Sequence, residues 1–251
     1  MRIHFNQVQK VYSANSEKPV VAVDNVHFTI EDGEFVSVLG PSGCGKSTLL
    51  MMLAGLENIS SGSIFIDEEK VESPQTNLGI VFQKPVLLPW RSVLDNIMLQ
   101  SEIRNLSKSE LKERALQLLD ITGLENFAEK LPHELSGGMQ QRVSIARALV
   151  HNPPLLLMDE PFAALDALTR EQMTDLLYQI WNESRKTVLF ITHSIQEAVM
   201  LSDKVVVLSP RPSQIEEILT IDLPRPRNMN DPGFVEYSQK IRRIFEAQGV
   251  L

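Results

Sequence analysis

Apolar and polar residues alternate over the first thirty positions of the chain, and the pattern then changes. Residues Arg2 to Tyr12 and Val20 to Ile30 alternate as half-buried antiparallel strands do. The segment from Glu34 to Leu39 is instead almost continuously apolar and leads into a glycine-rich turn, which is typical of a buried strand. These segments predict a small antiparallel β subdomain beside a larger sheet.

Further along, a mostly helical pattern occupies roughly residues 90–150. The sequence Ser107-Lys108-Ser109-Glu110 fits a capping box and predicts the start of a helix that stops near Gly123. The apolar face of this helix repeats at helical spacing, with Leu111, Ala115, Leu118 and Leu119. We therefore predict a helical subdomain inserted between strands of the sheet.

Short buried strands are predicted again after this insert, at Leu155 to Asp159, Val188 to Thr192 and Lys204 to Leu208. Their alternation with helical segments predicts an α/β fold around a largely parallel sheet. A short C-terminal tail follows, roughly residues 210–251, with an amphipathic helix from Pro232 to Ala247. We expect residues 1–251 to form a single domain.

Composition narrows the class of protein. The 251 residues are 43% hydrophobic and 22% charged, and no apolar run reaches the roughly 18 to 20 residues needed to cross a bilayer. The first residues lack the apolar core of a signal peptide, and a single cysteine fits a reducing compartment. A formal net charge of −8 disfavours nucleic-acid binding. We expect a cytoplasmic protein with no nucleic-acid partner.

A phosphate-binding motif follows the strand that ends at Leu39. It matches G-x-x-x-x-G-K-[ST], between a strand and a helix, and consists of Gly40, Pro41, Ser42, Gly43, Cys44, Gly45, Lys46, Ser47 and Thr48. Glycines let successive N–H groups point at phosphate oxygens, and the helix N-terminus attracts the same anion. We expect Lys46 to reach the β- and γ-phosphates and Ser47 to bind Mg²⁺. The alternative is an ordinary glycine-rich turn.

Cys44, the only thiol, lies inside this motif. Its side chain is expected to have no role, although the nearby helix N-terminus and Lys46 could lower its pKa and make it reactive.

Two adjacent carboxylates end the apolar strand that begins at Leu155. Carboxyl ends of strands are where α/β sheets bind ligands. We expect Asp159 to hold Mg²⁺ and Glu160 to polarise the attacking water. The alternative is a pair of solvated acids at a strand end.

The segment Leu135-Ser136-Gly137-Gly138-Met139-Gln140-Gln141-Arg142 lies just before this acidic strand and resembles the signature motif of ABC transporter ATPases. The resemblance covers roughly residues 1–210 and implies a P-loop NTPase core that binds ATP and Mg²⁺. It implies that Tyr12 stacks on adenine, that Gln83 touches Mg²⁺ and that His193 contacts the γ-phosphate. Asp166, in Ala164-Leu165-Asp166, resembles the D-loop residue. Without the resemblance, Tyr12 would be a core strand residue, and Gln83 and His193 ordinary polar residues.

The signature segment also opens a helix, so Ser136, Gly137 and Gly138 offer a second backbone anion site. One phosphate cradle already exists in the chain, and the family resemblance implies a head-to-tail homodimer in which this segment closes over ATP on the other chain. The alternative is a helix cap with two glycines.

The stretches Phe82 to Ile97 and Pro161 to Arg170, with Pro224-Arg225-Pro226-Arg227, resemble importers of nitrate, sulfonates and taurine. Ala163 departs from the glycine usual there. The resemblance implies transmembrane permease subunits as partners at the cytoplasmic face of the membrane, and an extracytoplasmic solute-binding protein acting indirectly. Heterocyclic solutes such as thiamine-pyrimidine precursors stay possible. An exporter subunit, or an ABC ATPase of DNA repair, translation or cluster assembly, is the alternative.

Leu87, Leu88, Pro89 and Trp90 form an apolar cluster shortly after Gln83. We expect this cluster to contact the permease, because apolar loop residues often mark an interface. The alternative is that they fill the seam between the helical subdomain and the sheet.

Overall fold

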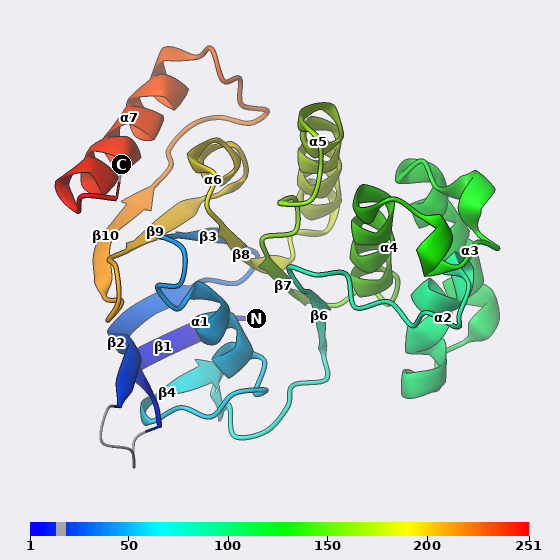
Figure 1. The fold of residues 1–251 in the computed structure, drawn as a ribbon, viewed down its shortest axis with the longest axis horizontal. Coiled ribbons are helices and arrows are strands. Elements are labelled where there is room, and N and C mark those ends of the chain that lie inside the picture. The colour runs from blue at the N-terminus through cyan, green and yellow to red at the C-terminus, as the bar shows by residue number, and fades with distance from the viewer. Residues whose placement is uncertain (14–18, 251) are drawn as a thin grey trace. The chain divides into compact units, whose positions relative to one another are not determined.

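A computed structural model describes residues 1–13 and 19–250 (Figure 1). The chain divides into two compact units. The first unit comprises Met1–Leu78 and Arg185–Leu251, and the second comprises Gly79–Ser184. The predicted helical insert lies within the second unit, which also contains the strand that ends in Asp159. Among the described residues, no helix is long and apolar enough to cross a membrane.

The first unit begins with a four-stranded antiparallel sheet, and the alternating pattern of the sequence predicts its first two strands. Its strand order is β2-β1-β4-β5, with the bounds β1 (Ile3–Tyr12), β2 (Val20–Ile30), β4 (Ser61–Ile66) and β5 (Glu69–Lys70). Alternate side chains of β1 are buried, and the Phe5 ring stacks on Phe28 with centroids 4.5 Å apart. The buried faces of β1 and β2 explain the period of two in the sequence.

The same unit holds four strands of the larger sheet, in the order β10-β9-β3-β8. Their bounds are β3 (Phe35–Leu39), β8 (Thr187–Thr192), β9 (Lys204–Leu208) and β10 (Ile215–Thr220). Strand β3 runs parallel to both β8 and β9, and Leu39 is in register with Thr192 and with Val207. The segments that follow these three strands therefore lie at one edge of the sheet.

Three helices belong to the first unit: α1 (Lys46–Leu53), α6 (Ile195–Leu201) and α7 (Pro232–Ala247). The predicted bounds of α7 are confirmed. Its apolar face, with Phe234, Ile241 and Phe245, joins a core cluster with residues of α6, β9 and β10 (Figure 1). Burial of these side chains fixes the tail to the unit.

Two arginines of the tail bind the carboxyl end of α6. Arg227 donates from Nη1 to the carbonyls of Val199, at 2.5 Å, and Ser202, at 2.7 Å. Arg225 donates to the Leu201 carbonyl at 2.7 Å and pairs with Asp203. Cations at a helix C-terminus satisfy its last carbonyls and oppose its dipole.

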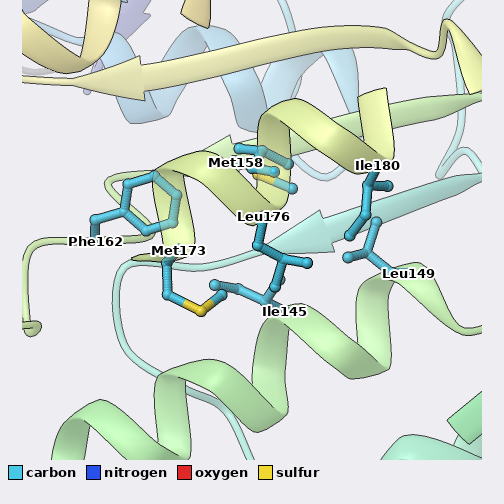
Figure 2. Close-up of a pocket in the computed structure, with 8 residues that line it drawn as sticks. Ile145, Leu149, Met158, Phe162, Met173, Leu176 and Ile180 are labelled. Atoms are coloured by element: carbon cyan, nitrogen blue, oxygen red, sulfur yellow. The ribbon is translucent and has the colours of Figure 1, made fainter. Parts of the chain in front are cut away.

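The second unit contains most of β6 (Leu78–Val81), β7 (Leu155–Asp159) and four α-helices. The helices are α2 (Val93–Arg104), α3 (Lys108–Ile121), α4 (Gly137–Leu149) and α5 (Ala167–Ser184), with 3₁₀ turns η1 (Glu125–Phe127) and η2 (Pro132–Glu134). Strands β6 and β7 are neighbours in the sheet. Side chains of α4, β7 and α5 face one another in an apolar seam with no space for water (Figure 2).

The prediction that a capping box at Ser107 starts α3 is wrong, although the helix does begin at Lys108. Ser107 occupies the N-cap position, but its side chain makes no capping hydrogen bond. Its hydroxyl lies 3.0 Å from the hydroxyl of Ser109 instead. The helix is held by its buried face, the one predicted from the sequence, and ends before Gly123, whose φ is +64°.

Candidate functional site

The phosphate motif lies between β3 and α1 in the first unit, the context that the sequence predicts. Gly43 and Gly45 have φ values of +73° and +114°, which an L side chain would adopt only with strain. A Cβ added at Gly40 would lie 2.8 Å from Sγ of Cys44. The loop is therefore tightly curled, and it ends at the N-terminus of α1, where backbone N–H groups are available to an anion.

Lys46 is buried at the base of this loop. Its Nζ donates to the carbonyl oxygens of Gly40, at 2.8 Å, and Pro41, at 3.0 Å. The ammonium group is thus held beside the curled backbone. A phosphate in the loop would meet both the N–H groups and this charge.

Tyr12 ends β1 beside the first turn of α1. Its hydroxyl lies 3.4 Å from Oγ1 of Thr48, and its side chain is 38% exposed. Lys10 Nζ lies 4.9 Å from the ring centroid, a cation–π distance. An exposed ring at this place is available for stacking, and its role in binding adenine stays a prediction.

His193 follows β8 and is exposed to solvent. Because Leu39 and Thr192 are in register on adjacent parallel strands, Gly40 and His193 both leave the sheet at the same edge. The side chain of Thr192 is tied to Glu197 of α6 at 2.5 Å, which fixes the backbone around His193. The first unit therefore brings together Tyr12, the phosphate loop and His193.

The acidic pair lies in the second unit, at the end of β7. Asp159 is buried, and Glu160 is half-buried with a φ of +45°, a left-handed conformation that costs energy in a residue other than glycine. Gln83 donates from Nε2 to Oε2 of Glu160 at 3.1 Å. The strained turn therefore presents the Glu160 carboxylate to Gln83, and the two residues form a polar cluster.

The signature segment caps α4. Ser136 is the N-cap, and its hydroxyl accepts from the N–H of Met139 at 3.3 Å. A Cβ added at Gly137 would meet nothing within 4 Å, whereas one at Gly138 would lie 3.3 Å from Leu165. Ser136 and Gly137 are exposed, so this helix N-terminus opens to solvent.

Asp166 caps the N-terminus of α5. Its carboxylate accepts from the backbone N–H of Thr169 at 3.0 Å and from the Thr169 hydroxyl at 2.7 Å, at the start of α5. These hydrogen bonds lower the pKa of Asp166 below its ordinary value. A contact between Asp166 and the nucleotide, as predicted from the sequence, would therefore be made by a carboxylate that also caps α5.

Three further contacts at these elements are not predicted by the sequence. In the second unit, Gln141 of α4 donates to the Phe82 carbonyl at 3.2 Å, and Arg147 of the same helix donates to the Val86 carbonyl at 2.6 Å. In the first unit, Arg211 donates to the phosphate loop. All three join segments far apart in the chain through backbone carbonyls, which leave no signal in the sequence.

Cys44 is not the reactive thiol that its position suggests. It is 1% exposed, and burial raises its pKa above the ordinary value, although the charges of Lys46 and Arg211 act in the opposite direction. Desolvation of the thiolate outweighs these attractions, because the side chain packs beneath Gly40. The possibility of a lowered pKa is thus contradicted.

We expect iodoacetamide to alkylate Cys44 slowly at pH 7. The thiolate is the reacting form, and a raised pKa keeps the group protonated to a higher pH than in an unfolded chain. The alkylation rate should rise at a higher pH in the folded protein than in the urea-unfolded protein. Mass spectrometry of timed samples measures both rates, and equal pH profiles for folded and unfolded protein would contradict this account.

Comparison with known proteins identifies the class. A family model described as ABC transporter matches residues 23–163, more than half of the chain. An uncharacterised ABC transporter ATP-binding protein of Methanocaldococcus jannaschii is 45% identical over 246 residues, covering 98% of this chain and 92% of that protein. A taurine import ATP-binding protein of Rhizobium johnstonii is 48% identical, over 94% of this chain and 93% of its own length.

An aliphatic sulfonates import ATP-binding protein of Bacillus cereus is 40% identical over 100% of this chain and 98% of its length. Among solved structures, a dimeric ATP-binding cassette in a post-hydrolysis state with ADP and Pi matches with a TM-score of 0.80 and 35% identity. The match covers 88% of this chain and all of that one.

The chain belongs to the ABC transporter family. Its α/β fold is that of the ABC ATPase, and its activity is ATP hydrolysis. The resemblance found in the sequence is confirmed.

Proposed function

We propose that this ATPase energises the import of a small solute of the taurine or sulfonate kind through separate permease subunits. The observation that carries the proposal is similarity over nearly the whole chain, at 39–48% identity, to proteins named for import of taurine and aliphatic sulfonates. The similarity extends through the tail that follows the matched family segment.

The residues that bind the adenine ring and the phosphates of ATP belong to the first unit. Tyr12 stacks on the adenine ring, and the N–H groups of the loop from Gly40 to Thr48 receive the phosphates. Lys46, already held beside the loop backbone, neutralises the β- and γ-phosphates. His193, at the same sheet edge, contacts the γ-phosphate.

Mg²⁺ is the expected cofactor, and the available donors suit it. Ser47, Gln83 and Asp159, the residues expected from the sequence to bind Mg²⁺, carry hydroxyl, amide and carboxylate oxygens, which are ligands that Mg²⁺ prefers. Within residues 1–13 and 19–250, no cluster of three or more His, Cys, Asp and Glu side chains could bind a metal alone. A metal ion that is also bound by nucleotide phosphates would need no such cluster, and Mg²⁺ held there would supply charge neutralisation for phosphoryl transfer.

Glu160 is the general base. The carboxylate accepts a proton from the water that attacks the γ-phosphate, and Gln83, 3.1 Å away, orients it. Asp159 precedes it on β7 and keeps a separate role in binding the metal. The two adjacent acids therefore divide metal binding and proton transfer between them.

A homodimer supplies the remaining ATP contacts. The exposed helix N-terminus at Ser136, Gly137 and Gly138 is an anion site in a chain that already has one phosphate loop. Related cassettes have been solved as dimers. We infer that this segment closes over ATP bound to the second copy, together with Asp166, which follows Leu165 beside Gly138.

The permease is contacted through the loop that contains Trp90, and a solute-binding protein outside the cytoplasm delivers the solute to it. This arrangement places the ATPase at the cytoplasmic face of the membrane. An exporter subunit would bind a permease but would show no dependence on an external binding protein.

Uptake in the source organism tests the proposal. Deletion of this gene should abolish accumulation of labelled taurine or an alkanesulfonate, and a plasmid copy of the wild type should restore it, whereas the Glu160→Gln variant should not. Nitrate and a thiamine-pyrimidine precursor are tested alongside. Undiminished uptake of all these solutes would contradict an import role in this class, and increased retention of a solute would indicate export.

A further inference from the structure

The segment Ser209–Gln214, which joins β9 to β10, lies against the phosphate loop. Strand β9 is parallel to β3, with Val207 in register with Leu39, so both segments emerge at one sheet edge. Two hydrogen bonds close the turn of the segment Ser209–Gln214. The Ser209 N–H donates to the Gln214 carbonyl, and the Gln214 N–H donates to the Ser209 hydroxyl, each at 3.0 Å. The position of this segment is therefore defined by the sheet.

A second set of contacts anchors the segment to β2. Ser213 is buried, and both its N–H, at 3.2 Å, and its hydroxyl, at 3.1 Å, donate to the Ala22 carbonyl. Asp24 returns a backbone hydrogen bond to the Ser213 carbonyl at 2.9 Å and accepts from the Gln214 side chain at 2.9 Å. A Cβ added at Gly45 would lie 3.3 Å from Oγ of Ser213. The anchor thus also packs against the loop.

Arg211 projects from this anchored segment onto the crest of the loop. Its Nη2 and Nε donate to the Gly43 carbonyl at 2.6 and 3.1 Å. That carbonyl shares a peptide group with the N–H of Cys44, which donates to Pro41 at 3.3 Å. The peptide between Gly43 and Cys44 is therefore held on both sides, next to a glycine with positive φ that could otherwise rotate.

The charge of Arg211 also reaches the loop interior. It lowers the pKa of the Cys44 thiol, as Lys46 does, against the larger effect of burial. The side chain is exposed, and among the described residues it donates to the Gly43 carbonyl and has no carboxylate partner. An arginine without a carboxylate partner keeps its field available to a bound anion.

We propose that Arg211 is a positioning residue of the ATP site, which fixes the Gly43–Cys44 peptide and adds a second positive charge beside Lys46. The proposal rests on the phosphate loop being the ATP site. It assigns Arg211 to nucleotide binding and not to proton transfer. Its loss should therefore affect affinity for ATP much more than turnover at saturation.

The test compares Arg211→Ala and Arg211→Lys with Arg242→Ala, an exposed arginine of α7, as the matched control. For Arg211→Ala we expect the Kd and the KM for MgATP to rise about tenfold and kcat to change less than twofold. Lysine keeps the charge but not the two-donor contact, so an intermediate Kd is expected. The control should match the wild type.

Cys44 provides a readout of the loop itself. Release of the Gly43 peptide should expose Cys44 and speed its alkylation several-fold in Arg211→Ala at a fixed pH. Exposure relieves the desolvation that raises the pKa of the thiol, and this effect is larger than the opposing loss of the Arg211 charge. The urea midpoint of unfolding should equal that of the control. Wild-type Kd and alkylation rate in Arg211→Ala would overturn the proposal. So would a fall in kcat, affinity and unfolding midpoint together in both variants, which would indicate a structural role only. Failure of the wild type to bind MgATP would instead overturn the proposed ATP site.

Discussion

Glu160→Gln should bind ATP like the wild type and hydrolyse it about 10² to 10⁴ times more slowly. The amide has the shape of the carboxylate and can still accept the hydrogen bond from Gln83, so the strained turn at the end of β7 should persist. It cannot take the proton of the attacking water. The loss should therefore fall on the chemical step.

Phosphate release at saturating MgATP measures this rate, and a fluorescent ATP analogue measures binding. Because ATP that is bound but not hydrolysed keeps two copies together, the variant should elute as a dimer in size-exclusion chromatography with MgATP. Glu171→Gln, at an exposed glutamate of α5, is the matched control. Wild-type turnover in Glu160→Gln would remove Glu160 from the role of base.

The sequence predicts part of the site around Glu160, and the structure adds its geometry. A buried strand ending in two acids could be found from the apolar run at Leu155 to Met158 alone. The positive φ of Glu160 and the contact with Gln83 could not, because they depend on how the chain turns after Asp159. Local periodicity predicts elements, whereas side-chain geometry depends on tertiary packing.

In the fold, too, the sequence predicts the elements that have a clear local pattern and misses those that do not. Strands β3, β8 and β9 are almost continuous apolar runs, so their predicted bounds agree with the structure to within a residue. Strand β10 (Ile215–Thr220) was not predicted, since it is a half-exposed edge strand with adjacent glutamates. Edge strands bury too little apolar surface to leave a clear pattern.

Contacts made by long polar side chains are the hardest to predict. Arg211 reaches Gly43 across 168 residues of sequence, and Arg227 reaches the carbonyls at the end of α6. Such contacts require an arginine and a backbone carbonyl, and every residue has a carbonyl. The raised pKa of Cys44 is likewise a result of burial, which the motif does not reveal.

The loop between Gln83 and α2 shows how packing decides between two predictions. Asn96 is buried, accepts from the Leu88 N–H at 2.8 Å and donates to the carbonyls of Leu88, Arg91 and Ser92. Arg147 holds the Val86 carbonyl. Leu88 is therefore half-buried and tied to the second unit. Its backbone contacts explain why it is a poor probe of an interface.

Trp90 is the residue of this loop on which permease binding should depend. It is 72% exposed, so a place in the core is wrong for this side chain. Its neighbour Arg91 forms a two-pronged ion pair with Glu102 at 2.8 and 2.9 Å, and this pair and Asn96 hold the backbone on either side. A large aromatic side chain on a fixed loop is typical of an interface anchor.

Trp90→Ala should leave basal ATP hydrolysis and the urea midpoint of the isolated chain nearly unchanged, because the side chain packs on little within it. Loss of an anchor aromatic typically costs about 2 kcal/mol or more of binding energy, so assembly with the permease should weaken at least roughly 30-fold. Co-purification with the permease and uptake in cells measure the loss.

Ile103→Ala, at a side chain of α2 that is 65% exposed, is the control and should assemble normally. Normal uptake with Trp90→Ala would remove this residue from the interface, and an equal loss in both variants would show that the effect is not specific to the loop.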